Sequence, residues 1–185
     1  MFFFSEKNND LTFKPISLEC AYLLIIQDDL AGAKRIFKAL DSPRSKWGGI
    51  LVDILNGYTE EFPTYFEIRN FLEIDLDFLL KNKKISYVEQ LLGALDFLAE
   101  INQESYKFTA RVMYENKLFN ASKKYLDKSK FIFYKDPELH FMYAKYFLHT
   151  HEYTEANYHI DECLKILPNY YPAKKLKHEI IEYLE

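Results

Sequence analysis

The sequence predicts an all-α fold in which antiparallel helix hairpins stack on one another. The 185 residues include only 5 Gly and 6 Pro, which favours helices joined by short connections. Apolar residues make up 49% and charged residues 28%, so the chain can bury a substantial core without disulfide bonds. A third observation is a period of about 34 residues in the C-terminal half, which is typical of repeated helix pairs.

The first predicted elements form a hairpin around the turn at residues 28–32. Small and large side chains alternate on both sides of this turn, as two crossing helices require: Ala21, Leu24, Ala33 and Phe37. The period fails between residues 41 and 81, since Ala33 and Val88 lie 55 positions apart (88 − 33), which is not a multiple of the repeat length. This region is therefore predicted to be irregular.

Local signals still predict two helices in the irregular region. Ser42 is a suitable N-cap and Pro43 a suitable first helical residue, so we expect a helix that ends near residues 56–57. A second helix is predicted from Pro63 to Asn82, unless it bends near Asp75. With these two, the chain holds about ten helices in a single domain spanning residues 1–185.

The repeat itself appears when residues 116–122 are aligned with residues 150–156, because an aromatic and a small residue coincide. The same shift brings residues 82–86 onto 116–120. The most complete copy covers residues 137–170, with large, small and aromatic side chains at fixed offsets: His140, Tyr143, Ala144, Phe147, Ala156, Ile160 and Pro168.

This pattern resembles the tetratricopeptide repeat (TPR) family. The copy at 103–136 has Tyr134 where the family has proline, and the copy at 69–102 keeps mainly its apolar positions. The resemblance implies a right-handed superhelical solenoid of stacked antiparallel hairpins. The last segment, 171–185, is then a capping helix, with Leu176, Ile180 and Leu184 turned inward and charged residues outward.

The resemblance also implies a function, because repeats of this family bind ligands along the concave face of their first helices. We therefore expect a module that binds a peptide or helix of a partner protein and needs no cofactor. Carried over by position, the groove shows Glu73 and Asp77, and then the candidate binding residues Lys107, Arg111, Tyr114, Phe141, Lys145, His149 and Lys175.

Three of these cations could clamp an acidic segment or a terminal carboxylate, namely Lys107, Arg111 and Lys145. The alternative is a solvated charged face balanced by nearby acids. A narrower hypothesis is a TPR-type secretion or assembly chaperone, which only size, charge and repeat type support.

A different class of function would use the histidines, all of which follow residue 139. His151, Glu155 and His159 are spaced by four residues, with Cys163 one step beyond, and such a row could hold zinc. We favour an ordinary helix face, since His151 is expected in a turn and Cys163 toward the core. No glycine-rich phosphate loop and no His-Glu-x-x-His motif occurs, so we do not expect an enzyme.

The net charge, the cysteines and the apolar segments predict where in the cell the protein resides. The net charge of -4 argues against nucleic acid as the main partner. Two cysteines are too few for a disulfide framework, so we expect Cys20 and Cys163 to be free thiols. The apolar residues 1–4 are followed at once by polar ones, unlike a secretory signal, and no apolar stretch is long enough to span a membrane. We expect a cytoplasmic protein whose apolar N-terminal tail either folds onto the first hairpin or docks on another copy in a homo-oligomer.

Overall fold

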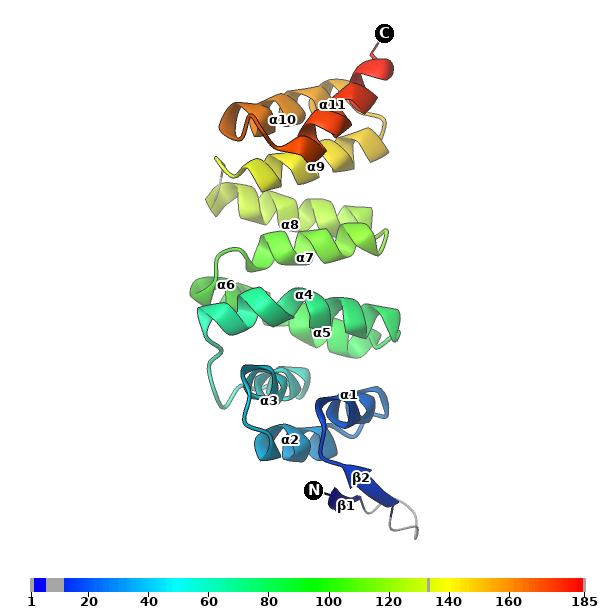
Figure 1. Ribbon diagram of the computed structural model, residues 1–185, viewed down its shortest axis with the longest axis vertical. Coiled ribbons are helices and arrows are strands. Elements are labelled where there is room, and N and C mark those ends of the chain that lie inside the picture. Colours follow the sequence, from blue (N-terminus) through cyan, green and yellow to red (C-terminus); the bar gives the residue numbers. More distant parts are fainter. Residues whose placement is uncertain (1, 6–11, 133, 185) are drawn as a thin grey trace. The chain divides into compact units, whose positions relative to one another are not determined.

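The computed structural model describes residues 2–5, 12–132 and 134–184. Eleven helices make up most of this part, which confirms the all-α class (Figure 1). The chain divides into two compact units, Met1–Asn102 and Gln103–Glu185. The expectation of a single domain stays a prediction.

A short β-hairpin precedes the helices and was not predicted. Strand β1 (Phe2–Ser5) pairs antiparallel with β2 (Thr12–Pro15), which sets Phe2 opposite Pro15. The apolar run was interpreted as a tail because four residues are too short to show a strand pattern. Its expected docking depends on side chains that lie outside the described part.

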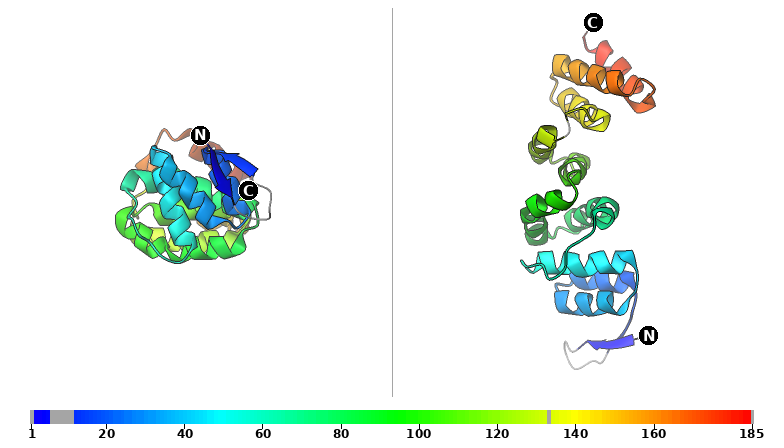
Figure 2. Two further views of the ribbon diagram at one scale, coloured as in Figure 1. Left: turned by 90° about the horizontal axis from the view of Figure 1, so that it is seen from below. Right: turned by 90° about the vertical axis from the view of Figure 1, so that its left-hand side faces the viewer.

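The described residues of the first unit form six helices. They are α1 (Leu18–Ile26), α2 (Leu30–Ala39), α3 (Pro43–Leu55), α4 (Tyr65–Lys81), α5 (Ile85–Gly93) and α6 (Leu95–Ile101). Contacts join α1 to α2 and α2 to α3, and both α3 and α5 to α4 (Figure 2). The predicted hairpin around residues 28–32 is confirmed as α1 and α2.

The irregular region also matches its prediction closely. Ser42 caps α3, its side chain accepts a hydrogen bond from the backbone N–H of Ser45, and Pro43 is the first helical residue. Helix α4 runs unbroken through Asp75. Ala94 ends α5 and begins α6, and this extra break raises the number of helices in the described part to eleven.

A buried carboxylate ties three helices of the first unit together. Asp75 on α4 is fully buried and accepts hydrogen bonds from Arg44 and Trp47 on α3, and from Tyr22 on α1 at 3.2 Å. Burial raises the pKa of Asp75, and the Arg44 guanidinium opposes that rise. Asp75 was considered from the sequence as a place where the helix could bend, and its burial was not predicted.

Five helices form in the second unit, counted over 103–132 and 134–184. They are α7 (Ser105–Glu115), α8 (Phe119–Ile132), α9 (Pro137–His149), α10 (Tyr153–Ile166) and α11 (Tyr171–Glu182). Ala144 and Ala156 are fully buried where α9 meets α10, as predicted, and Cys163 and Ile180 share their core. Leu184 is 48% exposed beyond the end of α11, so its predicted inward position is wrong.

The helix hairpins share one type of turn. Lys83, Lys117 and His151 adopt left-handed backbone conformations with φ of 57°, 62° and 62°, and they lie 34 positions apart (117 − 83 and 151 − 117). Asp28 does the same between α1 and α2 with φ of 63°. At each turn the next backbone N–H donates to a carbonyl five residues back, as from Leu118 to Met113 at 2.8 Å. The backbone thus repeats the period that the sequence showed.

Glycine at these turns is expected to stabilise the protein. A residue with a Cβ is strained in the left-handed region, whereas glycine is not. Replacing the exposed Lys117 with glycine should raise the free energy of unfolding by about 0.5 kcal/mol, after allowance for the greater freedom of glycine in the unfolded chain. Thermal unfolding followed by circular dichroism measures this change.

A glycine in the middle of a helix provides the matched control. Lys124 is exposed on α8, and Lys124→Gly should lower the free energy of unfolding by about 1 kcal/mol. Equal losses in Lys117→Gly and Lys124→Gly would contradict the turn assignment.

Candidate partner-binding surface

All seven candidate residues predicted from the sequence lie in the second unit. Lys107, Arg111 and Tyr114 are on α7, Phe141, Lys145 and His149 on α9, and Lys175 on α11. Helix α9 contacts both α7 and α11, so the three helices lie side by side within this unit. We call the side chains that they present around Lys145 the α9 face.

Two cavities adjoin on the α9 face. A smaller one of about 190 Å³ is lined in part by Arg111, Tyr114, Phe141 and Lys145. A larger one of about 510 Å³ includes Tyr114, Lys145 and His149 in its wall. Tyr114 and Lys145 belong to both walls, so they stand at the junction of the two cavities. Five of the seven predicted residues are thus brought together, while Lys107 and Lys175 line neither cavity.

Lys107 is not available as a groove cation. Its side chain is 4% exposed, and its ammonium lies 2.5 Å from Asp136, 3.0 Å from Glu104 and 3.2 Å from Glu138. Burial lowers the pKa of Lys107, but the hydrogen bond and charge of Asp136 outweigh it, so the pKa is raised. Lys107 joins the start of α7 to the start of α9, and the three-cation clamp is not present in this form.

Arg111 is also neutralised within the unit. Its guanidinium forms an ion pair with Glu138, the second residue of α9. The pair is partly exposed, so its contribution to stability is modest. This arrangement fits the alternative hypothesis of a charged face balanced by nearby acids.

Lys145 differs from both. It is half-buried, and its ammonium sits 4.5 Å from the centroid of the Tyr114 ring, a cation–π contact. The hydroxyl of Tyr114 donates a hydrogen bond to the backbone carbonyl of Lys145 at 3.2 Å, which fixes the ring beneath the amine. In the described part of the chain, no carboxylate forms an ion pair with Lys145.

The pKa of Lys145 reflects this environment. Burial lowers it, Glu115 opposes the change, and the charge of Arg111 adds to it. A cation that has lost part of its hydration without gaining a carboxylate is stabilised when an anion binds. Among the cations that line the two cavities, Lys145 is therefore the one that an added anion would stabilise most, since Arg111 is already paired with Glu138.

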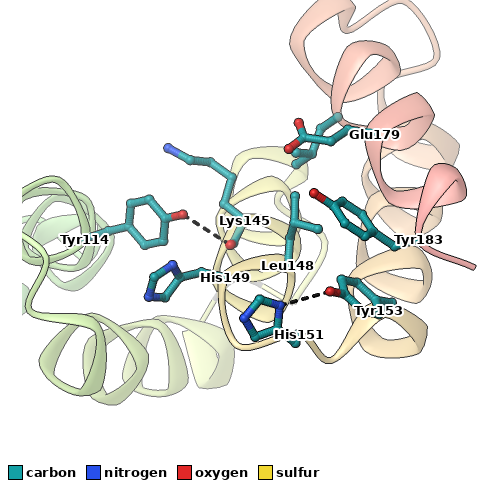
Figure 3. A pocket seen from close by; sticks show the side chains of 9 residues that line it. Tyr114, Lys145, Leu148, His149, His151, Tyr153, Glu179 and Tyr183 are labelled. Carbon is teal, nitrogen blue, oxygen red and sulfur yellow. Dashed lines mark hydrogen bonds between the residues drawn. The ribbon is translucent and has the colours of Figure 1, made fainter.

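Aromatic and apolar side chains line much of the larger cavity. The Tyr153 and Tyr183 rings stack with centroids 4.8 Å apart, and the Tyr153 hydroxyl lies 2.9 Å from Nδ1 of His151 (Figure 3). His149 stacks on Phe119 of α8 at 3.6 Å. The stacked tyrosines close one side of the larger cavity and hold a shape into which a side chain can insert.

Six residues of the larger cavity were missed by the sequence analysis: Leu148, His151, Tyr153, Leu176, Glu179 and Tyr183. Only groove positions of the first helices were considered there, whereas His151 lies in a turn and Tyr153 begins a second helix. Glu179 adds a negative charge to the same wall, and after burial it is the second cause that raises the pKa of Tyr114. The 34-residue period could have found Tyr153, because it aligns with Phe119.

The histidine row proposed for zinc is separated by the fold. His151 lies in the turn with positive φ, and Cys163 is fully buried in the core, as predicted. Glu155 is exposed, while His159 is buried against His140. In the described residues, no group of three His, Cys, Asp or Glu side chains could hold a metal ion.

A further cavity, of about 450 Å³, lies in the first unit between α2 and α3. Each of its three lysines is paired with a carboxylate of the same cavity: Lys34 with Asp53 and Glu60, Lys38 with Glu60, and Lys46 with Asp41. Both cysteines are free and buried. Among the described helices, none has the length and apolar character that a membrane span requires.

These features define the chain as an all-helical protein built of helix hairpins with a common turn. Comparisons with models of protein families, with curated proteins and with solved structures found no match.

Proposed function

We propose that the chain is a TPR-type protein-binding module whose α9 face holds a segment of a partner protein. In the proposed architecture, the helix hairpins stack in one continuous right-handed superhelix. It is supported by the turns that recur every 34 positions and by the small buried residues Ala144 and Ala156 at a helix crossing. We further propose that the module acts in the cytoplasm and without catalysis.

A single observation supports the site more than any other. Lys145 is a half-buried cation without an ion pair in the described residues, and it stands between two cavities with aromatic walls. A carboxylate of the partner would neutralise this amine, while neighbouring apolar side chains of the same segment would fill the cavities. The proposed ligand is therefore an acidic peptide segment with a large apolar residue close to its carboxylate.

Removal of the Lys145 charge should weaken such binding. A hydrogen bond to a charged group contributes about 1.5–3 kcal/mol, so Lys145→Met should lower affinity about tenfold or more. The measurement uses an immobilised library of short peptides, each with a free or an amidated C-terminus, and compares the peptides retained by the original protein and the variant.

Lys175→Met is the matched control. It removes the same charge from an exposed position on α11 that lines neither cavity, and it should change affinity by less than about twofold. Should Lys145→Met retain the same peptides with the same affinity, the site would be rejected. If both variants lose the same affinity for the peptides, general electrostatic attraction would explain the binding instead.

A further inference from the structure

Two histidines face each other inside the α9–α10 hairpin. Nδ1 of His140 on α9 lies 2.9 Å from Nδ1 of His159 on α10, and both side chains are buried. Nε2 of His140 lies 2.8 Å from the backbone carbonyl of Tyr134, in the connection between α8 and α9. The pair thus links α10, α9 and the segment that leads into α9.

The hydrogen bonds fix which nitrogens carry protons. A carbonyl oxygen only accepts, so Nε2 of His140 must donate to Tyr134. In a neutral His140 ring, Nδ1 is then an acceptor, and Nδ1 of His159 must be the donor. The unprotonated nitrogens of the neutral pair are consequently Nδ1 of His140, which accepts this hydrogen bond, and Nε2 of His159. A proton on both Nδ1 atoms would place two donors against each other and break the contact.

The surroundings disfavour added positive charge. The His159 ring stacks on Tyr143 at 4.6 Å and on Phe147 at 5.5 Å, so the site is largely apolar. The charged and titratable groups that face the pair come from α8, from the following connection, from α9 and from α10: Lys123, Asp127, Lys130, Tyr134, Tyr143, Tyr158 and Glu162. Asp127 is engaged by Lys123 and Tyr143, and Glu162 by Lys165.

We propose that the His140–His159 pair is a proton-sensitive latch, closed when both rings are neutral and opened by acid, which separates α10 from α9. The rings supply a polar contact within an otherwise apolar helix crossing. Protonation makes that contact a buried charge beside two lysines, and the open hairpin lets the charge return to water.

The pKa of His159 sets the pH range. Burial lowers it from 6.5 to about 4, with smaller contributions from His140, Lys130 and Lys123, and Glu162 opposes them. Because the closed hairpin binds the proton more weakly than the open one, the contribution of the neutral pair to the stability of the closed hairpin is complete above about pH 6.5. This contribution is lost as the pH falls from about 6.5 toward about 4.

Opening of the latch should affect the candidate site, because α9 carries residues of the latch and of the site. Phe141, Lys145 and His149 project from the same helix that His140 holds against α10. Opening would therefore disturb the α9 face and release a segment held there. This consequence rests on the proposed function, whereas the latch itself does not.

Hydrogen exchange of the whole chain tests the latch without any ligand. Between about pH 7 and about pH 4.5, protection factors of the α10 amides should fall at least tenfold, since each pKa unit corresponds to a factor of ten. In His159→Asn, the asparagine amide can still donate to His140 but does not titrate, so the fall should shrink to less than about threefold. His178→Asn, at an exposed histidine on α11, should behave as the original protein does.

Nitrogen NMR of the imidazole rings gives a second readout that needs no variant. We expect the Nδ1–H form of His159 and the Nε2–H form of His140 at neutral pH. An Nε2–H form of His159, or titration of that ring near pH 6.5, would overturn the proposal. The proposal would also be overturned if acid lowered the protection factors of the α10 amides as much in His159→Asn as in the original protein.

Discussion

Replacing Asp75 with alanine is expected to destabilise the first unit by about 3–5 kcal/mol, because it leaves the partly buried Arg44 charge and the fully buried Trp47 N–H without their acceptor. Trp47 is the one tryptophan of the sequence, so its fluorescence during denaturant unfolding reports on this unit alone. The denaturation midpoint should fall with little change in slope.

Asp77 offers the control on the same helix. Its carboxylate pairs with Lys81 four residues later, in a partly exposed position. Asp77→Ala should cost less than about 0.5 kcal/mol. The double variant Arg44→Met/Asp75→Leu, which removes both charges of this ion pair, should recover part of the loss. If the single variants at 75 and 77 lose the same stability, the buried network contributes no more than a surface pair.

Alanine at Gly48 and alanine at Gly49 are expected to act in opposite directions. A Cβ on Gly48 would lie 2.6 Å from Cδ1 and Cζ of Phe37, whose ring is buried between α2 and α3 and contacts Tyr22 edge-on at 5.3 Å. Overpacking of this kind costs about 1–3 kcal/mol, and the gain in helix propensity of about 1 kcal/mol offsets only part of it.

Gly49 has open space on the side where alanine would carry its methyl group, with nothing within 4 Å. Gly49→Ala should therefore raise the free energy of unfolding by about 0.5–1 kcal/mol. The two substitutions are chemically identical and adjacent in α3, so only their packing differs. Unfolding followed by Trp47 fluorescence should show shifts of opposite sign; stabilisation by both would contradict the close approach of α2 and α3.

Helix starts and hairpin turns could be predicted because their causes lie within a few residues. Ser42 and Pro43 begin α3 through a side-chain cap and a fixed φ. The small residues Ala144 and Ala156 marked a crossing because a repeat places them at constant offsets. The break at Ala94 was missed, although Gly93 ends α5 directly before it and is a local signal for a helix end.

The candidate site was predicted in outline only. Tyr114 and Lys145 were placed on one face from their repeat positions, and the structure brings them into contact. Sequence reasoning could not separate Lys145 from Lys107, because both are lysines on first helices. Their difference depends on Asp136, 29 residues from Lys107, which removes one amine from the surface and leaves the other.

The sequence alone determined the helical class, the period and the approximate bounds of α3, α4 and α11, since these follow from local propensity, capping and the spacing of apolar residues. Only the tertiary structure decided which polar groups are buried and with what partners. The hydrogen-bond donors of Asp75 lie 28, 31 and 53 positions away in the sequence, and the histidine that contacts His140 lies 19 positions away. Such pairings arise from the packing of helices against one another, and no local pattern encodes them.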